Sequence, residues 1–277
     1  MARYDELTLR NAGYVAPSLQ QSIRRCRVLI AGCGVGSTIA EAATRMGFEH
    51  FVLADGDVVE RHNLNRQAFC EADIGDLKTN ALSRRILAIN PEAKVSTLDH
   101  YIASNNAASI VAGCDMVFDT IDFLDLSGIA SLHDEANRQG KPVISAVSAG
   151  WGAVLMFCPP KPAEPSIFRR MFGLPQSGPV DNASYVERFG VLFGALSDRL
   201  SPEVVQAMGR ALTRMEDGTP CPAPHVSAGS YSVAALAVTC AVQVLGGETP
   251  TAAPQLIVID LLGELSRPGV SVITASS

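Results

Sequence analysis

The stretch Val28-Leu29-Ile30-Ala31-Gly32-Cys33-Gly34-Val35-Gly36 decides the fold of this chain. Four apolar residues ended by a glycine are typical of a buried parallel strand. Apolar residues at helical spacing follow from Ser37 to Met46. A strand, a glycine turn and a helix in this order bring backbone N–H groups and a helix N-terminus close to an anion. Gly32, Gly34 and Gly36 are therefore candidate phosphate-binding residues.

Outward from this unit, apolar strands alternate with helical stretches as far as about residue 158. The sequence predicts strands over 51–54, 94–98, 116–118 and 142–147, and helices over 76–89, 104–112 and 124–139. This alternation predicts an α/β fold, a doubly wound and mostly parallel Rossmann-like sheet with helices on both faces.

After Gly150 the regular pattern of strands and helices is interrupted by prolines. A strand is expected over 152–157, and prolines then interrupt a region with helical stretches over 184–197 and 202–215. An apolar helix over 230–245 and a last strand over 255–260 follow. We therefore expect one domain overall, made of four parts: an N-terminal helical segment (1–26), a nucleotide-binding core (27–158), a crossover or substrate-facing insertion (159–226), and a C-terminal helix and strand that complete the core (227–277).

Composition bounds the class of protein. The chain has 277 residues, of which 47% are apolar and 18% charged, so a sizeable core is expected and global disorder is not. The net charge of −6 argues against a nucleic-acid partner. The longest apolar runs, such as Val233–Val238, are too short to cross a bilayer, and the N-terminus carries no apolar signal region. We expect a cytoplasmic protein without a membrane partner.

The seven cysteines are irregularly spaced, and no CxxC pair occurs. A four-cysteine zinc site is therefore not expected, and most of the cysteines are interpreted as small core residues.

A second polar stretch runs from Asp55 to Gln67. Asp55 ends the predicted second strand, where a carboxylate can accept hydrogen bonds from the hydroxyls of a ribose. Asp57 is a weaker candidate, because it is as suited to ordering the loop as to contacting a ligand. Asn63, Asn65 and Arg66 place amides and a guanidinium group beside the phosphates, where a dinucleotide enzyme does not need them. Lys78, at the start of the next helix, can reach the same phosphates.

Two carboxylates, Asp119 and Asp122, follow the predicted fourth strand at the edge where open α/β sheets bind ligands. Carboxylates beside a triphosphate indicate Mg²⁺, and we favour Asp122 as its ligand. The alternative is that Asp122 caps the following helix.

This set of residues resembles the ThiF/MoeB/HesA superfamily, which includes the ubiquitin-activating enzymes. The resemblance covers roughly residues 8–158. It is carried by the glycine turn, Asp55-Gly56-Asp57, Asn63-Leu64-Asn65-Arg66-Gln67, Lys78, Asp119-x-x-Asp122, and Arg10-Asn11-x-Gly13 with Gln20-Gln21.

The resemblance implies an adenylyltransferase. Such enzymes use ATP and Mg²⁺ to adenylate a carboxylate, commonly the C-terminus of a ubiquitin-like protein or a peptide, and they release pyrophosphate. By this pattern Asp55 holds the ribose, Asn63, Arg66 and Lys78 hold the phosphates, and Asp122 holds Mg²⁺. Arg10 would reach the nucleotide of the other subunit in a homodimer.

This chain departs from the family pattern in three ways. Its glycine turn is one residue shorter than Gly-x-Gly-Gly-x-Gly, Phe123 replaces the usual Asn, and the paired CxxC zinc motifs of many relatives are missing. The missing zinc motifs and the proline-broken insertion over 159–226 favour a specialised substrate over a housekeeping one. Cys221, in a proline-flanked loop, is a possible acyl acceptor, although a loop cysteine without a role is the favoured interpretation.

Two other functions are compatible with part of the sequence. An NAD-dependent oxidoreductase accounts for the glycine turn and Asp55, but it leaves Asn63–Gln67, Lys78 and Asp122 without a role. A nucleotide-binding module of this fold without turnover is the other alternative, and it is motivated by the shortened glycine turn and by Phe123.

Overall fold

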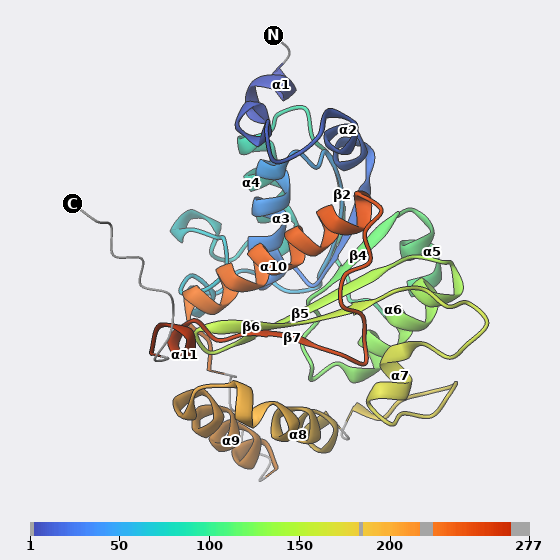
Figure 1. Cartoon of the computed structure of the whole chain (residues 1–277), viewed down its shortest axis with the longest axis vertical. Coiled ribbons are helices and arrows are strands. Elements are labelled where there is room, and N and C mark those ends of the chain that lie inside the picture. Colours follow the sequence, from blue (N-terminus) through green and yellow to red (C-terminus); the bar gives the residue numbers. More distant parts are fainter. Residues whose placement is uncertain (1–2, 183–184, 217–223, 267–277) are drawn as a thin grey trace, which may run out of the picture.

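The computed structural model describes residues 3–182, 185–216 and 224–266. Its centre is a seven-stranded sheet with the strand order β3-β2-β1-β4-β5-β6-β7 (Figure 1). Strands β1 to β5 run parallel, and β6 pairs antiparallel with both β5 and β7, so β6 runs opposite to the other six strands. The strands are β1 (Arg27–Ala31), β2 (His50–Ala54), β3 (Lys94–Leu98), β4 (Met116–Asp119), β5 (Val143–Ala149), β6 (Gly152–Cys158) and β7 (Ile257–Ile259).

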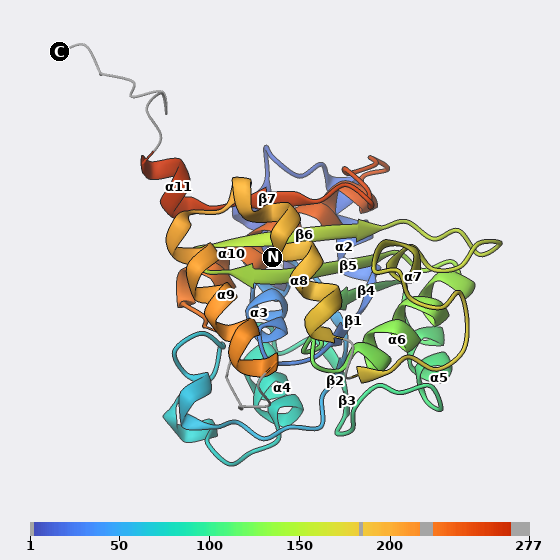
Figure 2. The same cartoon turned by 90° about the horizontal axis from the view of Figure 1, so that it is seen from below.

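Helices cover both faces of the sheet, as the alternating pattern predicted. On one face, Val28 and Ile30 of β1 pack with helices that include α3 and α10; on the other, Leu29 and Ala31 pack with α5 and α6. Figure 2 shows these layers from below. The helices are α1 (Arg3–Leu7), α2 (Pro17–Arg25), α3 (Gly36–Met46), α4 (Lys78–Ile89), α5 (Ala107–Ala112), α6 (Leu126–Arg138), α7 (Ile167–Met171), α8 (Tyr185–Leu196), α9 (Pro202–Glu216), α10 (Ser227–Leu245) and α11 (Leu261–Ser266).

Helix α10 is longer than expected from the sequence, since it begins at Ser227 rather than at residue 230. Its 19 residues could cross a membrane by length and composition alone. In the structure, however, Val233, Ala237 and Ala241 are fully buried in the core that α10 shares with α3. Helix α10 therefore packs as a core helix of this α/β domain.

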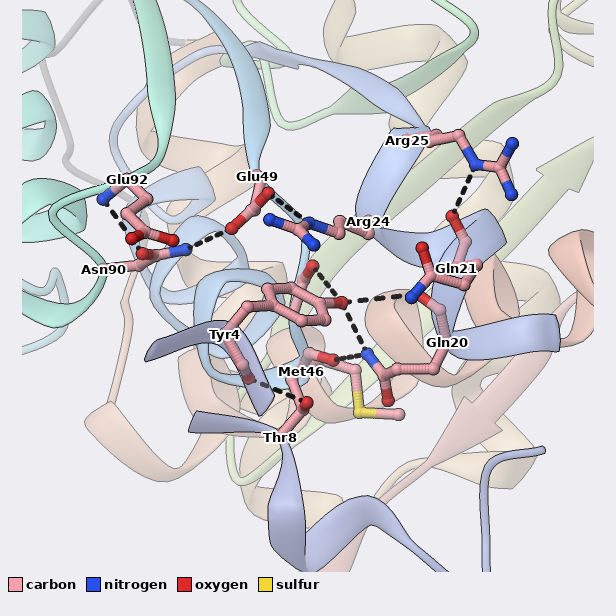
Figure 3. Close-up of polar contacts among 11 residues, drawn as sticks. Tyr4, Thr8, Gln20, Gln21, Arg24, Arg25, Met46, Glu49, Asn90 and Glu92 are labelled. Carbon is pink, nitrogen blue, oxygen red and sulfur yellow. Dashed lines mark hydrogen bonds and ion pairs between the residues drawn. The ribbon is translucent and has the colours of Figure 1, made fainter. Parts of the chain in front are cut away.

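The N-terminal segment is fastened to the C-terminal end of α3 (Figure 3). The Tyr4 hydroxyl donates a hydrogen bond to the carbonyl of Gly47 at 3.0 Å, and Gln20 Nε2 donates to the carbonyl of Met46 at 3.0 Å. Arg24 Nε lies 2.7 Å from Glu49 Oε2. These contacts fix α1 and α2 at the end of α3 opposite to the glycine turn.

Candidate active site

A cavity of about 430 Å³ lies at the carboxyl ends of the parallel strands. The turn after β1, the loop after β2, the start of α4 and the loop after β4 all contribute to its wall. Eight of the residues predicted from the sequence line it: Gly32, Gly34, Asp55, Asp57, Asn63, Arg66, Lys78 and Asp122. The structure thus brings together residues that are up to 90 positions apart in the chain, since Gly32 and Asp122 differ by 90 in number.

The three glycines of the turn have different surroundings. Gly32 has φ +86°, and a Cβ there would lie 2.5 Å from the carbonyl oxygen of Thr120. A Cβ on Gly36 would lie 2.5 Å from Thr120 Oγ1, so both glycines allow the turn to pack against the loop after β4. Gly36 does not line the cavity. Gly34 does, and it faces the side chain of Gln67.

Asp55 is buried and fixes the loop around it. Its Oδ2 accepts a hydrogen bond from the backbone N–H of Cys33 at 2.7 Å, and its Oδ1 accepts one from Asp57 at 2.8 Å. Burial raises the pKa of Asp55, while the charge of Lys78 and these two N–H groups oppose the rise. Each carboxylate oxygen keeps a further lone pair, which can accept a hydroxyl from a ligand.

Asp57 forms an ion pair with Lys78. Lys78 Nζ lies 2.6 Å from Asp57 Oδ2, and the Tyr101 hydroxyl donates to Asp57 Oδ1. Burial acts to raise the pKa of Asp57, but the bonds from Lys78 and Tyr101 outweigh it and the pKa is lowered. Tyr101 also lines the cavity and was not predicted; the only signal for it is its place just after β3.

Part of the Asn63–Gln67 run lines the cavity, and part of it holds the loop in place. Asn63 Oδ1 accepts the N–H of Glu60 at 2.9 Å, which leaves its amide nitrogen as the donor for a ligand. Arg66 Nη1 donates to the carbonyl of His62 at 2.9 Å, and its buried Nε has no hydrogen-bond partner among the described residues. Asn65 does not line the cavity; its Nδ2 donates to the carbonyl of His225 at 3.2 Å.

Asp119 also lines the cavity, as a buried carboxylate with partners inside the protein. Its Oδ2 lies 2.9 Å from His133 Nε2 and accepts the hydroxyl of Ser145. Burial acts to lower the pKa of His133, but hydrogen bonds from its ring to Asp119 and Cys158 raise it. Asp119, His133 and Ser145 therefore form a buried polar cluster between β4, α6 and β5.

Asp122 is not the cap of α6. The N-cap is Asp125, whose Oδ1 accepts the N–H of Gly128 at 3.0 Å. Asp122 is exposed, accepts only the N–H of Leu124 in the contacts described, and lines the cavity. Burial lowers the pKa of Arg66, and the negative charge of Asp122 opposes that shift. The capping alternative for Asp122 is therefore wrong.

Three residues of the cavity that were not predicted as site residues each have a buried polar atom without a hydrogen-bond partner among the described residues. These atoms are Gln67 Oε1, Ser148 Oγ and His225 Nδ1. Such atoms are expected to bind a ligand or water. Burial and the charge of Arg66 lower the pKa of His225 to about 4, so its ring is neutral at pH 7.

Two predicted residues lie elsewhere. Arg10 belongs to a short 3-10 helix, Leu9–Asn11, beside the C-terminal end of α3, where Asn11 Nδ2 donates to the carbonyl of Met46 at 3.1 Å. The cavity is at the other end of α3, so Arg10 does not line the cavity of its own chain. Cys221 lies outside the described residues.

No group of three or more His, Cys, Asp or Glu side chains in the part of the chain that the structure describes is arranged to hold a metal ion. A site of one or two carboxylates that is completed by phosphate oxygens is a different arrangement, and Asp122 suits it.

A model of the ThiF family matches residues 8–273. The chain belongs to the ThiF family. The resemblance found in the sequence is thereby confirmed, and it extends beyond residue 158 through the crossover region.

Curated relatives differ in what their names describe. A SAMP-activating enzyme E1 of Haloferax volcanii is 28% identical over 66% of this chain and 67% of its own length. A tRNA threonylcarbamoyladenosine dehydratase of Haemophilus influenzae is 35% identical over 54% of this chain and 59% of its own. A sulfur carrier protein adenylyltransferase of Thermus thermophilus is 26% identical over 70% of this chain and 73% of its own.

Solved structures confirm the fold of this ThiF-family chain. The Escherichia coli MccB structure with ATP has a TM-score of 0.64 and 20% sequence identity. The match covers 87% of this chain and 63% of that one, so this chain spans less than two thirds of that relative. At this identity the likeness supports the predicted doubly wound α/β architecture and nothing finer.

Proposed function

We propose that this protein binds ATP and Mg²⁺ and adenylates a carboxylate, the C-terminus of a ubiquitin-like protein or of a peptide. The observation that carries the proposal is the convergence of Arg66, Lys78 and Asp122 on one cavity beside the glycine turn. Membership of the ThiF family, an adenylyltransferase among the relatives and the ATP in the MccB structure support it.

In this proposal the cavity holds ATP along the strand ends. Asp55 accepts the ribose hydroxyls through its remaining lone pairs. The backbone at Gly34, the amide of Asn63, and the cations of Arg66 and Lys78 hold the phosphates. Two buried polar atoms have no partner among the described residues and gain one when the nucleotide enters; they are Gln67 Oε1 and Arg66 Nε.

The proposed reaction is one displacement at phosphorus. A carboxylate oxygen of the substrate forms a bond to the α-phosphorus, the bond from that phosphorus to the bridging oxygen breaks, and pyrophosphate leaves with the electron pair. No general base is needed, because a carboxylate is already a nucleophile at neutral pH. Arg66 and Lys78 neutralise the charge that develops on the phosphate oxygens.

Mg²⁺ fits this site through Asp122. A magnesium ion in a phosphate site commonly uses one or two carboxylates together with phosphate oxygens, and it supplies positive charge to those oxygens. Asp122 offers an exposed carboxylate on the cavity wall, and its Oδ1 accepts only one backbone N–H in the contacts described.

The assembly is proposed as a homodimer in the cytoplasm. Arg10 lies at the far end of α3 from the cavity of its own chain, so a role with nucleotide requires a second chain.

The relatives named for activating SAMP and for adenylating a sulfur carrier protein support a small protein substrate. The dehydratase relative acts on a tRNA nucleoside by its name, but the net charge of −6 does not favour a tRNA partner here. Cys221 lies outside the described residues, so a loop cysteine without a role stays the favoured interpretation and acyl transfer to it stays the untested alternative.

Exchange of labelled pyrophosphate into ATP tests the proposal. The pure protein is incubated with ATP, Mg²⁺ and labelled pyrophosphate, with and without candidate carboxylate partners. Exchange that depends on a partner is the expected result. Tight ATP binding with no exchange for any partner would indicate a nucleotide-binding module, and tight NADH binding without ATP binding would indicate an oxidoreductase.

A further inference from the structure

The cavity has a second part that the nucleotide residues do not account for. It extends from Phe123 under the crossover helices and is lined by apolar side chains of β6, α7, α8 and α9. We call this part the apolar chamber; its main residues are Met156, Phe168, Met171, Phe189, Leu192 and Met208. The described side chains that β6, α7, α8 and α9 contribute to the wall carry no charge.

A row of aromatic rings joins the chamber to the loop that carries Asp122. Phe123, the next residue in the chain, has its ring centroid 5.2 Å from that of Phe189. Phe189 lies 5.1 Å from Phe172, and Phe172 lies 4.6 Å from Phe168. Phe123 stands where the family usually has Asn, so this chain has exchanged a polar group at the cavity for one end of an apolar wall.

The wall of the chamber is built from packed side chains. Phe168, Phe189 and Met208 are 2%, 6% and 5% exposed, so only a small part of each side chain faces the cavity and the rest is packed in the protein. Helices α8 and α9 pack against β6 through Val154 and Met208, and Figure 2 shows both helices lying across the sheet there. Methionine side chains on the wall can adapt to the shape of an apolar ligand.

Two observations limit what the chamber accepts. A charged or strongly polar group would lose its hydration there without gaining a partner from the side chains that α7, α8 and α9 contribute to the wall. A ligand that ends in glycine would leave the chamber unfilled. A bulky apolar side chain would fill it, and the apolar surfaces of both the side chain and the wall would then be shielded from water. Ser148 Oγ, which is buried and unpartnered among the described residues, lines the same cavity and can donate to a polar backbone group of such a ligand.

We propose that the adenylated carboxylate belongs to a peptide whose C-terminal residue has a bulky apolar side chain, which the apolar chamber binds. This inference rests on the proposed adenylation and names its substrate class. The side chain enters the chamber past Phe123, while the carboxylate stays beside Asp122 and the phosphates.

Pyrophosphate exchange with four matched peptides tests the inference. The peptides acetyl-Ala-Gly-Phe, acetyl-Ala-Gly-Leu, acetyl-Ala-Gly-Gly and acetyl-Ala-Gly-Asp differ only in the last residue. We expect the Phe and Leu peptides to exceed the Gly and Asp peptides about tenfold or more in exchange rate per concentration, the scale set by filling a hydrophobic pocket. Exchange that is as fast or faster with Gly or Asp overturns the chamber inference and leaves adenylation standing. Exchange with none of the peptides, nor with any other carboxylate partner, overturns both.

A pair of neighbouring variants separates the chamber from the rest of α8. Leu192→Trp fills the chamber, whereas Val191→Trp adds the same ring at a site that is 73% exposed and outside the cavity. We expect Leu192→Trp to reduce exchange with the Phe peptide about tenfold while ATP binding is retained, and Val191→Trp to leave both unchanged. ATP binding to each variant, measured by calorimetry, verifies the fold. Unchanged exchange with the Phe peptide in a Leu192→Trp protein that binds ATP would refute the chamber as its binding site.

Discussion

Lys78 Nζ lies 2.6 Å from Asp57 Oδ2, so the lysine predicted to hold phosphate is already paired with a carboxylate on the cavity wall. The Lys78 side chain is 9% exposed and that of Asp57 is 46% exposed. A phosphate oxygen that enters the cavity must therefore compete with Asp57 for the same ammonium group. Tyr101 holds the other oxygen of Asp57 and keeps the carboxylate in place.

Asp57→Asn should increase the affinity for ATP and lower the stability of the ATP-free protein. Loss of a partly exposed ion pair corresponds to ~1 kcal/mol, or about fivefold in Kd. The free protein is left with a nearly buried ammonium group whose partner no longer carries a negative charge, so its Tm should fall and ATP should restore it. Calorimetric titration and thermal unfolding with and without ATP measure both effects. Weaker ATP binding by Asp57→Asn would mean that Asp57 itself contacts the nucleotide favourably.

Arg66→Ala should reduce pyrophosphate exchange about a hundredfold or more, as expected when an electrostatic stabiliser of the transition state is removed. Arg61→Ala is the matched control. Arg61 is exposed, pairs with Glu71 at 2.5 Å and does not line the cavity, so exchange should be unchanged. Equal effects of the two substitutions would remove Arg66 from the site.

Asp122→Asn and Asp125→Ala should affect different properties. Asp122→Asn should raise the Mg²⁺ concentration needed for half-maximal exchange, with little change in Tm. Asp125→Ala removes the N-cap of α6 and should destabilise the protein by ~1 kcal/mol without changing the Mg²⁺ requirement. Magnesium titrations and thermal melts of both variants distinguish the two roles. A lower Tm as the only effect of Asp122→Asn would contradict its assignment to the metal.

His225 should make the protein less stable as the pH falls from about 6.5 towards 4. Burial and the charge of Arg66 lower its pKa from 6.5 to about 4 in the folded protein, so over this window the unfolded chain binds the additional proton. The stability that follows from the neutral ring is present above pH 6.5 and is lost on acidification. Thermal unfolding at several pH values should show a shallower fall for His225→Gln than for the natural protein. Parallel curves would place His225 in a more polar environment than the structure does.

The sheet and most of its helices were predictable because their signals are local. Successive side chains of Val28–Ala31 point to the two opposite cores of the protein. Around this run, strands and helices follow one another at regular spacing. Helices α7 and α11 were missed because each has only five or six residues, and α7 follows a proline-rich segment. The ribose and phosphate candidates were found from motifs, and the structure gathers most of them at one cavity.

The remaining features depend on contacts between distant segments. Gly36 was expected near phosphate, but it is needed for close approach to Thr120, which is 84 positions away. Asn65 was expected there too, and instead it fastens the loop to His225. Tyr101 and Ser148 carry no motif, so only the folded chain places them at the cavity. The helix cap, Asp125, stands three residues after Asp122, for which capping was the alternative interpretation.

Phe123 has one further consequence. It is bonded directly to Asp122, and its ring packs on Phe189 of the crossover helices. A ligand that contacts the Phe123 ring therefore acts on the residue next to the carboxylate proposed for the metal. Thermodynamic linkage makes any such effect reciprocal: the factor by which the peptide changes the affinity for magnesium–ATP must equal the factor by which magnesium–ATP changes the affinity for the peptide. The binding of the two substrates of the proposed reaction would then be coupled through the peptide bond that joins Asp122 to Phe123.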